Sequence, residues 1–278
     1  MSSESRTRAG GDGRSLLLPA VSAVVLGGAF VLAPRMLAGS APGGGLHDEN
    51  DVRSAVRAGF VEYWDTGDRA LSSALAATVE YWSRYHLAKA VLAGLLVIVL
   101  VTLSVRLWRA FLVAERPVRL GVVSGLVTAL ALFAVVATMA NIQGVVAPYA
   151  STLPMLTEPP VHRELAGVLN QLTRNLADSI HADGTLLPAV AVLLDDFVRY
   201  HQAMIAIACV TAVAFVAAGV RLWRARAGAE DRRARRTFAA LAAVTVAAAA
   251  ASAVVALANI TTVADPAPAL LALFTGSW

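Results

Sequence analysis

The chain has 278 residues, 58% of them apolar and only 15% charged, and its mean hydropathy is +0.65. An ordinary soluble domain is far less hydrophobic, so the composition predicts an integral membrane protein. The net charge of +4 does not indicate a nucleic-acid partner, because the basic residues flank long apolar stretches, where orientation in a bilayer explains them. Since Cys209 is the only cysteine, no intrachain disulfide can form.

Five apolar stretches are long enough to cross a hydrocarbon core, which takes about 20 helical residues. They cover residues 15–37, 87–108, 120–142, 203–223 and 238–263. We expect residues 1–14 to form a disordered cytoplasmic tail, residues 15–38 an anchor span, and residues 39–50 a flexible glycine-rich linker. A cleaved signal peptide is the alternative for residues 15–38, but the apolar run exceeds the about 7–15 residues usual for its core.

The segments 46–86 and 157–201 between spans each begin with a predicted amphipathic helix. The apolar residues that recur at helical spacing are Val52, Val56, Phe60, Tyr63 and Trp64 in the first, and Leu165, Val168, Leu172, Leu176 and Ile180 in the second. Each helix should end at a turn, Thr66-Gly67-Asp68 or Ala182-Asp183-Gly184. From Arg69 a single helix is expected to run to Arg109, with its first part standing above the membrane against the amphipathic helix.

The chain aligns with itself. Residues 66–109 match residues 181–224 without a gap, including Arg84-Tyr85-His86 with Arg199-Tyr200-His201, and Ala140-Asn141-Ile142 matches Ala258-Asn259-Ile260. The alignment predicts a duplicated two-span unit, repeat 1 at residues 51–150 and repeat 2 at residues 157–268. Because each unit has two spans, both copies share one orientation, and a four-helix bundle with a pseudo-two-fold axis along the membrane normal is expected.

Two arginine-rich segments, 106–119 and 221–236, predict the orientation, because positive residues stay on the cytoplasmic side. The arginines assigned to this role are Arg106, Arg109, Arg221, Arg224, Arg232, Arg233, Arg235 and Arg236. The N-terminus is then inside, whereas both amphipathic segments and a C-terminal tail at residues 269–278 are outside.

Aromatic residues at the span ends fit interface anchors, Tyr85 and Tyr200 outside and Trp108 and Trp223 inside. Glu80 with Arg84, and Asp195 with Arg199, have the spacing of i,i+4 ion pairs on a helix.

Two histidines and two asparagines form the candidate site. His86 lies 22 residues from Trp108, and Asn141 lies 22 residues from Arg119 on the returning helix, so both rise about 33 Å from the cytoplasmic side. His201 and Asn259 stand in nearly the same relation. A buried imidazole and carboxamide at one level should hydrogen-bond, which predicts one structural His–Asn latch per repeat. The alternative is that His86 and His201 face each other and ligate a haem b.

The sequence shows no P-loop, HExxH or nucleophile elbow, so no catalytic residue is assigned and a non-enzymatic role is expected. The remaining histidines lack metal-ligand spacing, and no metal is expected. The arginine, alanine and valine bias is typical of a high-GC bacterial genome. We therefore expect a scaffold or partner-binding protein of a bacterial plasma membrane, whose partners are the lipid bilayer, an envelope protein and a further copy of the chain. A haem-binding redox protein is one alternative. A small-solute channel or transporter not driven by protons is another, because the spans carry no ionisable residue at mid-depth.

Overall fold

The computed structural model describes residues 4–39, 46, 48–181 and 185–277, and all regular structure in these ranges is helical. Five helices are long and apolar enough to cross a membrane. They are α1 (Glu4–Gly39, with the apolar span Leu16–Gly39), α3 (Ser73–Val113), α4 (Val118–Val146), α7 (Pro188–Ala227) and α8 (Arg232–Ala264). The others are α2 (Glu49–Thr66), the 3-10 helix η1 (Ala150–Thr152), α5 (Pro154–Thr157), α6 (Arg163–His181) and α9 (Pro266–Thr275). The prediction of an all-helical chain with five candidate spans is confirmed, and the fold is consistent with a helical membrane protein.

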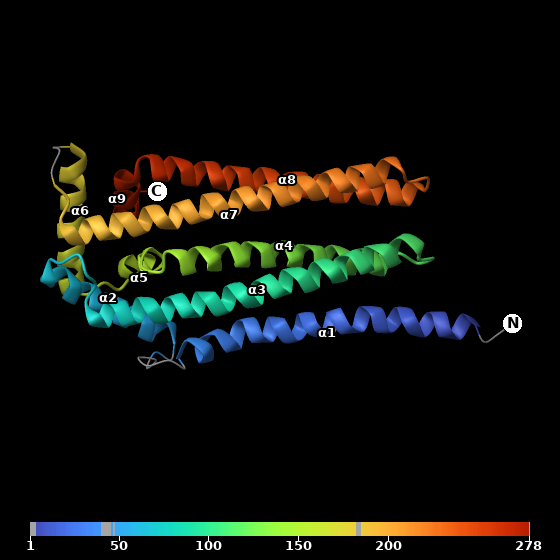
Figure 1. Ribbon diagram of the computed structural model, residues 1–278, viewed down its shortest axis with the longest axis horizontal. Helices are drawn as coiled ribbons and strands as arrows, with labels where there is room; N and C mark the ends of the chain where they lie inside the picture. The colour runs from blue at the N-terminus through green and yellow to red at the C-terminus, as the bar shows by residue number, and fades with distance from the viewer. Residues whose placement is uncertain (1–3, 40–45, 47, 182–184, 278) are drawn as a thin grey trace.

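The long helices lie side by side along the length of the molecule (Figure 1). Helix α3 packs against α4, α7 packs against α8, and α1 lies along α3, while α4 and α7 join the two hairpins. Large apolar side chains such as Leu87, Val91 and Ile98 are exposed on the outward surface. Lipid would cover such a surface.

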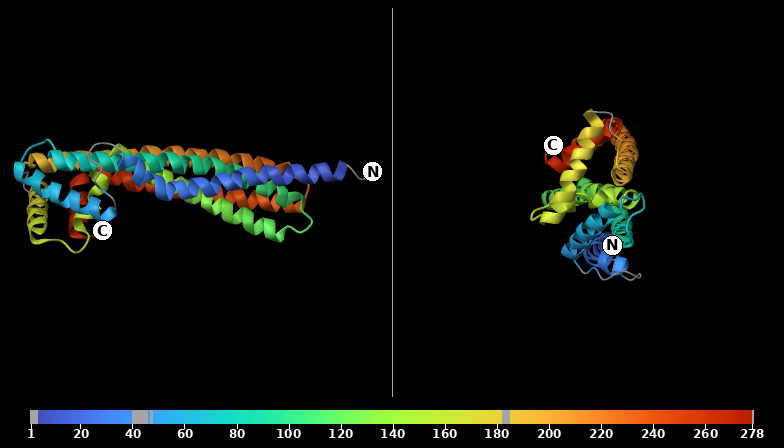
Figure 2. Two further views of the ribbon diagram at one scale, coloured as in Figure 1. Left: turned by 90° about the horizontal axis from the view of Figure 1, so that it is seen from below. Right: turned by 90° about the vertical axis from the view of Figure 1, so that its left-hand side faces the viewer.

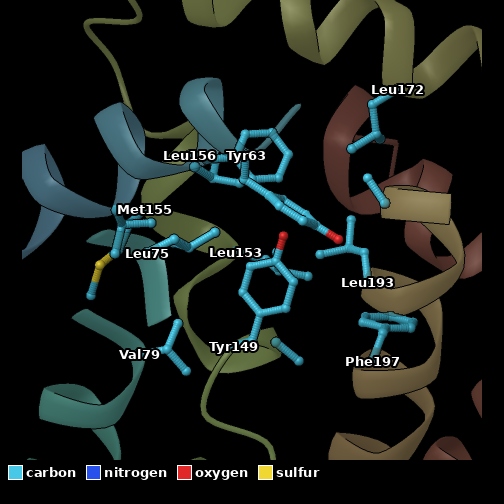
Figure 3. Close-up of a cluster of buried hydrophobic side chains, with 14 of the residues drawn as sticks. Tyr63, Leu75, Val79, Tyr149, Leu153, Met155, Leu156, Leu172, Leu193 and Phe197 are labelled. Carbon is cyan, nitrogen blue, oxygen red and sulfur yellow. The ribbon is translucent and has the colours of Figure 1, made fainter. Parts of the chain in front are cut away.

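The short helices gather at the end of the bundle opposite the N-terminus (Figures 1 and 2), and we call this part the cap. The cap consists of α2, η1, α5, α6, α9 and the first turns of α3 and α7. Its buried apolar side chains form one cluster that draws on all of these elements. Figure 3 shows Tyr63 from α2, Leu153 and Leu156 from the α4–α6 connection, and Leu193 from α7 converging there. The cap is therefore one packed unit.

Local sequence explains how the first cap helices begin and end. Asp48 caps α2, accepting a hydrogen bond from the Asp51 backbone while the Asp51 side chain accepts one from the Asp48 backbone. Gly67 ends α2 in the left-handed conformation, with φ of 67°. Ser72 then caps α3, which runs for 41 residues. Gly59 lets α2 approach α3, because a Cβ there would lie 3.1 Å from the Cα of Leu75.

The structure differs from the sequence-based segment boundaries at both ends of the chain. Helix α1 begins at Glu4, inside the segment expected to be disordered. Residues 269–278 were expected to form a tail, but most of them belong to α9, whose Leu270 is fully buried and which packs against α6. The reason is that Pro266 starts a new helix whose apolar residues complete the cap cluster. Residues 40–45 and 47 of the expected linker, and the Ala182-Asp183-Gly184 turn, lie outside the described residues.

Candidate functional site

His86 on α3 and Asn141 on α4 form a side-chain hydrogen bond inside the first hairpin. His86 Nδ1 lies 2.9 Å from Asn141 Oδ1, and Asn141 Nδ2 donates to the carbonyl oxygen of Ala137 over 2.7 Å. Because the amide nitrogen already has an acceptor, Asn141 Oδ1 is the atom that accepts, and His86 must donate from Nδ1.

The second hairpin carries the same arrangement. His201 Nδ1 on α7 lies 2.7 Å from Asn259 Oδ1 on α8, and Asn259 Nδ2 donates to the carbonyl oxygen of Val255 over 2.7 Å. The donor and acceptor roles are fixed by the same reasoning as in the first hairpin. Each hairpin is thus joined by one His–Asn pair at matching positions.

Each pair leaves one nitrogen atom unused. Nε2 of His86 and Nε2 of His201 are both buried and have no hydrogen-bond partner. When Nδ1 carries the proton of a neutral imidazole, Nε2 has a lone pair that can accept a hydrogen bond or bind a metal ion. A buried acceptor without a partner is unfavourable, so each of these two atoms is a candidate to bind a further group.

Aromatic rings enclose both imidazoles. The ring of His86 meets Trp82 edge-on at 4.7 Å between centroids, and the ring of His201 meets Phe197 at 4.5 Å. Tyr85 and Tyr200, predicted as interface anchors, stand in T-shaped contact with His86 and His201 respectively. Among the described residues, no hydrogen bond or ring contact joins one imidazole to the other. Each histidine is held within its own hairpin.

The predicted anchors and arginines at the other end of the spans have more specific contacts than the sequence indicates. Trp108 Nε1 donates to Thr128 Oγ1 over 3.0 Å, and the Arg226 guanidinium lies 4.4 Å from the ring centroid of Trp223. Arg233 Nη1 lies 2.8 Å from the carbonyl oxygen of Ala114 and 3.4 Å from those of Phe111 and Leu112. Arg233 on α8 therefore satisfies carbonyl groups at the C-terminal end of α3 and ties the two hairpins together there.

One of the two predicted ion pairs is different in the structure. Glu80 and Arg84 are paired at 2.5 Å, but Asp195 contacts Arg69 at 3.6 Å instead of Arg199. Arg199 contacts Asp196 at 3.4 Å. Asp196 is the buried carboxylate of the two, and its Oδ2 accepts from the backbone nitrogen of Ala150 over 2.8 Å, which joins α7 to the end of the first hairpin.

The connection between the hairpins is held by Arg57 on α2. Its Nε donates to the carbonyl oxygen of Met155 over 2.8 Å, Nη1 donates to that of Pro160 over 2.8 Å, and Nη2 donates to that of Glu158. One guanidinium thus binds three backbone acceptors, one in α5 at Met155 and two after it at Glu158 and Pro160, a geometry that suits its fixed fork of donors. The sequence contains no signal for this contact.

A groove of about 580 Å³ crosses the cap surface between α2 and the start of α6. Its polar lining residues are Ser54, Arg57, Glu62, Asp65, His162 and Glu164. Arg57 donates to the backbone carbonyl oxygens of Met155 and Pro160, whereas Glu62, Asp65 and Glu164 are exposed carboxylates that outnumber it. The groove therefore presents an acidic surface. In the part of the chain that the structure describes, no cluster of three or more His, Cys, Asp or Glu side chains has the geometry to hold a metal ion.

Burial also acts on the tyrosines of the cap. It raises the pKa of Tyr149 well above the usual value, and the nearby Tyr63 and Asp196 raise it further. Burial likewise raises the pKa of Tyr63. Both hydroxyl groups are buried without a hydrogen-bond partner, and both point into the middle of the cap cluster (Figure 3).

Comparison with known protein families, curated proteins and solved structures gives no match to this chain.

Proposed function

We propose that this chain is a non-enzymatic, multi-pass protein of a bacterial plasma membrane that binds an envelope partner through its cap. The five apolar helices support the membrane location, and the arginines at the α3–α4 and α7–α8 turns favour a cytoplasmic position for those turns. The N-terminus is then inside, and the cap and the C-terminus are outside. The matching His–Asn pairs support an origin of the two hairpins by duplication.

The observation that carries the proposal is the acidic groove on a rigidly packed cap. The cap has a buried cluster of its own, so the groove lies on a fixed surface and a partner would not have to order it. Glu62, Asp65 and Glu164 line the groove and outnumber its one arginine, Arg57, whose guanidinium donates to backbone carbonyl oxygens. Charge complementarity then favours a basic partner segment rich in lysine or arginine.

Co-purification after crosslinking in native membranes tests this proposal. We expect a variant with Glu62→Gln, Asp65→Asn and Glu164→Gln to lose a protein that the unmodified chain retains. The contact should also weaken with salt, because exposed charges are screened beyond about 8 Å at physiological ionic strength. Unchanged recovery of every retained protein would contradict the proposal.

A matched control separates loss of the groove from general loss of negative charge. Asp68 and Asp178 are exposed carboxylates of the cap that do not line the groove. The double variant Asp68→Asn, Asp178→Asn should retain the partner at the level of the unmodified chain. Loss of the partner in both variants would show that the overall charge of the cap, and not the groove, attracts it.

A second candidate function is supported by the unpartnered Nε2 atoms of His86 and His201. Neutral imidazoles with a free Nε2 are the histidine form that binds haem iron, and their Nδ1–H groups are already oriented by asparagine. If the chain binds haem b, protein purified after expression with haem supplied will show a Soret band, and His86→Ala will remove it. A colourless preparation would exclude this function.

A further inference from the structure

The two hairpins pack around a cavity of about 520 Å³ in the half of the spans that carries Trp108. The α3–α4 hairpin contributes Val101, Trp108 and Thr128 to the lining, and the α7–α8 hairpin contributes Phe215, Leu222 and Phe238. We call the surface of α3–α4 that carries Val101, Trp108 and Thr128 its front face. The front face of α7–α8 is the surface that carries the matching residues of the self-alignment.

The residues on the two sides of the cavity do not match one another in the self-alignment. Residues of α3 match residues of α7 that lie 115 positions later, so Phe215 and Leu222 match Leu100 and Leu107. Leu100 and Leu107 lie in a different buried cluster, against which Leu16, Ala20 and Ala23 of α1 are packed. We call this second surface the back face. The hairpins therefore pack front to back, which corrects the expectation of a pseudo-two-fold axis, since such an axis would bring matching faces together.

Front-to-back packing arranges α1, α3–α4 and α7–α8 in a row, and only one end of this row has its hairpin face covered by another helix. Helix α1 covers the back face of α3–α4, and the front face of α3–α4 meets the back face of α7–α8. Figure 1 shows this order, with α1 and the α7–α8 hairpin at opposite edges of the molecule. The front face of α7–α8 is the hairpin face that no other described helix of the same copy covers.

This remaining front face is hollowed and exposed. Val216, Trp223 and Val246, which match Val101, Trp108 and Thr128, line a cavity of about 360 Å³ together with Gly219 and Ala249. The side chains of Val246 and Trp223 are 63% and 57% exposed in the described part of the chain. In α3–α4 the same face is covered by another transmembrane segment. Small residues such as Gly219 and Ala249 permit close helix approach within a membrane.

We propose that the front face of α7–α8 binds a second copy of this chain through that copy's α1. Helix α1 already covers one hairpin face. The opposite side of α1 carries large aliphatic side chains, and Leu18, Val21 and Leu32 are all exposed there. Large side chains of α1 can fill the hollow in the front face of α7–α8, because small residues, Gly219 and Ala249, line it. The contact joins unlike surfaces, so it repeats from copy to copy and generates a closed ring or an open row.

The depth of α1 in the bundle agrees with this pairing. The Lys89 ammonium lies 4.8 Å from the ring centroid of Phe30, and Ala23 and Gly27 share a cavity lining with Ala93 and Leu96. Transferred to α7 by the alignment, this register places Gly28 of a neighbouring copy within about one helical turn of Cys209. Both positions are exposed, and a Cβ at Gly28 would meet nothing within 4 Å.

Cysteine crosslinking in native membranes tests the contact with the full chain. The Gly28→Cys variant retains the natural Cys209 and should form a ladder of adducts with a membrane-permeant bismaleimide. Neither the unmodified chain nor Gly28→Cys with Cys209→Ser should form that ladder. Within one copy, α1 with residue 28 and α7 with Cys209 lie on opposite sides of the α3–α4 hairpin, so the adducts must join different copies (Figure 1). Absence of adducts in the two-cysteine variant, after a monofunctional maleimide has shown that both thiols react, would overturn the proposal.

Substitution of the face supplies an independent readout. Val246→Trp should fill the hollow and suppress the ladder, whereas Val136→Trp, at a valine of α4 that is 61% exposed, should not. A dimer formed through Cys209 in the unmodified chain would show that two α7–α8 faces meet each other symmetrically, and this would also overturn the proposed contact with α1.

Discussion

The imidazole of His86 lies directly against the Cα of Gly144. A Cβ at residue 144 would be 2.7 Å from Cγ and 2.9 Å from Nδ1 of the ring, closer than non-bonded atoms approach. Gly144 stands three residues after Asn141 on α4, so the residue that accepts the hydrogen bond and the residue that makes room for the ring belong to the same turn. The position of the imidazole therefore depends on both.

Gly144→Ala should displace the His86 ring and destabilise the first hairpin. Overpacking of this kind costs about 1–3 kcal/mol of unfolding free energy, because neither the ring nor the helix backbone can move freely. Equilibrium unfolding in mixed detergent micelles measures the change. Gly94→Ala is the matched control, since a Cβ there meets nothing within 4 Å and alanine favours a helix. Equal stability of the Gly144→Ala and unmodified proteins would show that the ring has room to move.

The His–Asn hydrogen bonds should appear as energetic coupling within each hairpin. We expect a double-mutant cycle with His86→Phe and Asn141→Leu to give a coupling energy of about 0.6 kcal/mol and at most about 1.7 kcal/mol, the average and the maximum found for hydrogen bonds between membrane helices. The cycle that combines His86→Phe with Asn259→Leu serves as the control, because those side chains belong to different hairpins. Equal coupling in the two cycles would mean that the effect does not come from the hydrogen bond.

Much of the helical framework, and the relation between His86 and Asn141, can be predicted from sequence for clear physical reasons. Apolar length determines where a helix can cross a bilayer. A fixed rise per residue lets equal counts on antiparallel helices predict equal depth, and His86 and Asn141 lie at such equal counts. Gly144 was not predicted, because a glycine in a membrane helix has many uses and only the position of the ring shows which one applies.

Contacts to backbone carbonyl groups were missed because no residue pattern encodes their acceptors. Arg57 and Arg233 bind carbonyl oxygens that become available only when a distant turn or helix end reaches them. The packing of the hairpins was mispredicted for a related reason. The self-alignment gives both hairpins the same two faces, but the sequence does not show which face meets which.

Replacement of Arg57 should loosen the connection between the hairpins. Arg57→Lys keeps the charge, but one ammonium group cannot reach the carbonyl oxygens of Met155, Glu158 and Pro160 together. Because hydrogen bonds to charged groups contribute about 1.5–3 kcal/mol, we expect destabilisation of the cap by about that amount and faster proteolysis of residues 154–162. Arg174→Lys, at an exposed residue of α6, should change neither quantity. Equal proteolysis rates for the Arg57→Lys variant and the unmodified chain would show that the apolar cluster alone holds this segment.

Tyr149 should make the cap sensitive to alkaline pH. Burial raises the pKa of its hydroxyl group above the value in the unfolded chain, which is about 10. Below pH 10 the hydroxyl group is protonated in the folded and the unfolded chain, so its ionisation does not change the free energy of unfolding. As the pH rises above 10, the unfolded chain releases the proton while the folded chain retains it, so the unfolding free energy falls by at most about 1.4 kcal/mol per pH unit for this one group.

Tyr149→Phe should remove this contribution and leave the smaller one from Tyr63, whose pKa is also raised by burial. At neutral pH the same variant should be as stable as the unmodified chain or slightly more stable, because the hydroxyl group of Tyr149 is buried without a partner. The measurement is the free energy of unfolding between pH 8 and pH 11 for the unmodified chain, for Tyr149→Phe and for the double variant Tyr63→Phe, Tyr149→Phe. Differences between their slopes against pH give the contributions of Tyr149 and Tyr63 separately. If Tyr149→Phe loses stability with pH as steeply as the unmodified chain, the hydroxyl group of Tyr149 ionises as readily in the folded cap as in the unfolded chain, and the cap cluster is open to water.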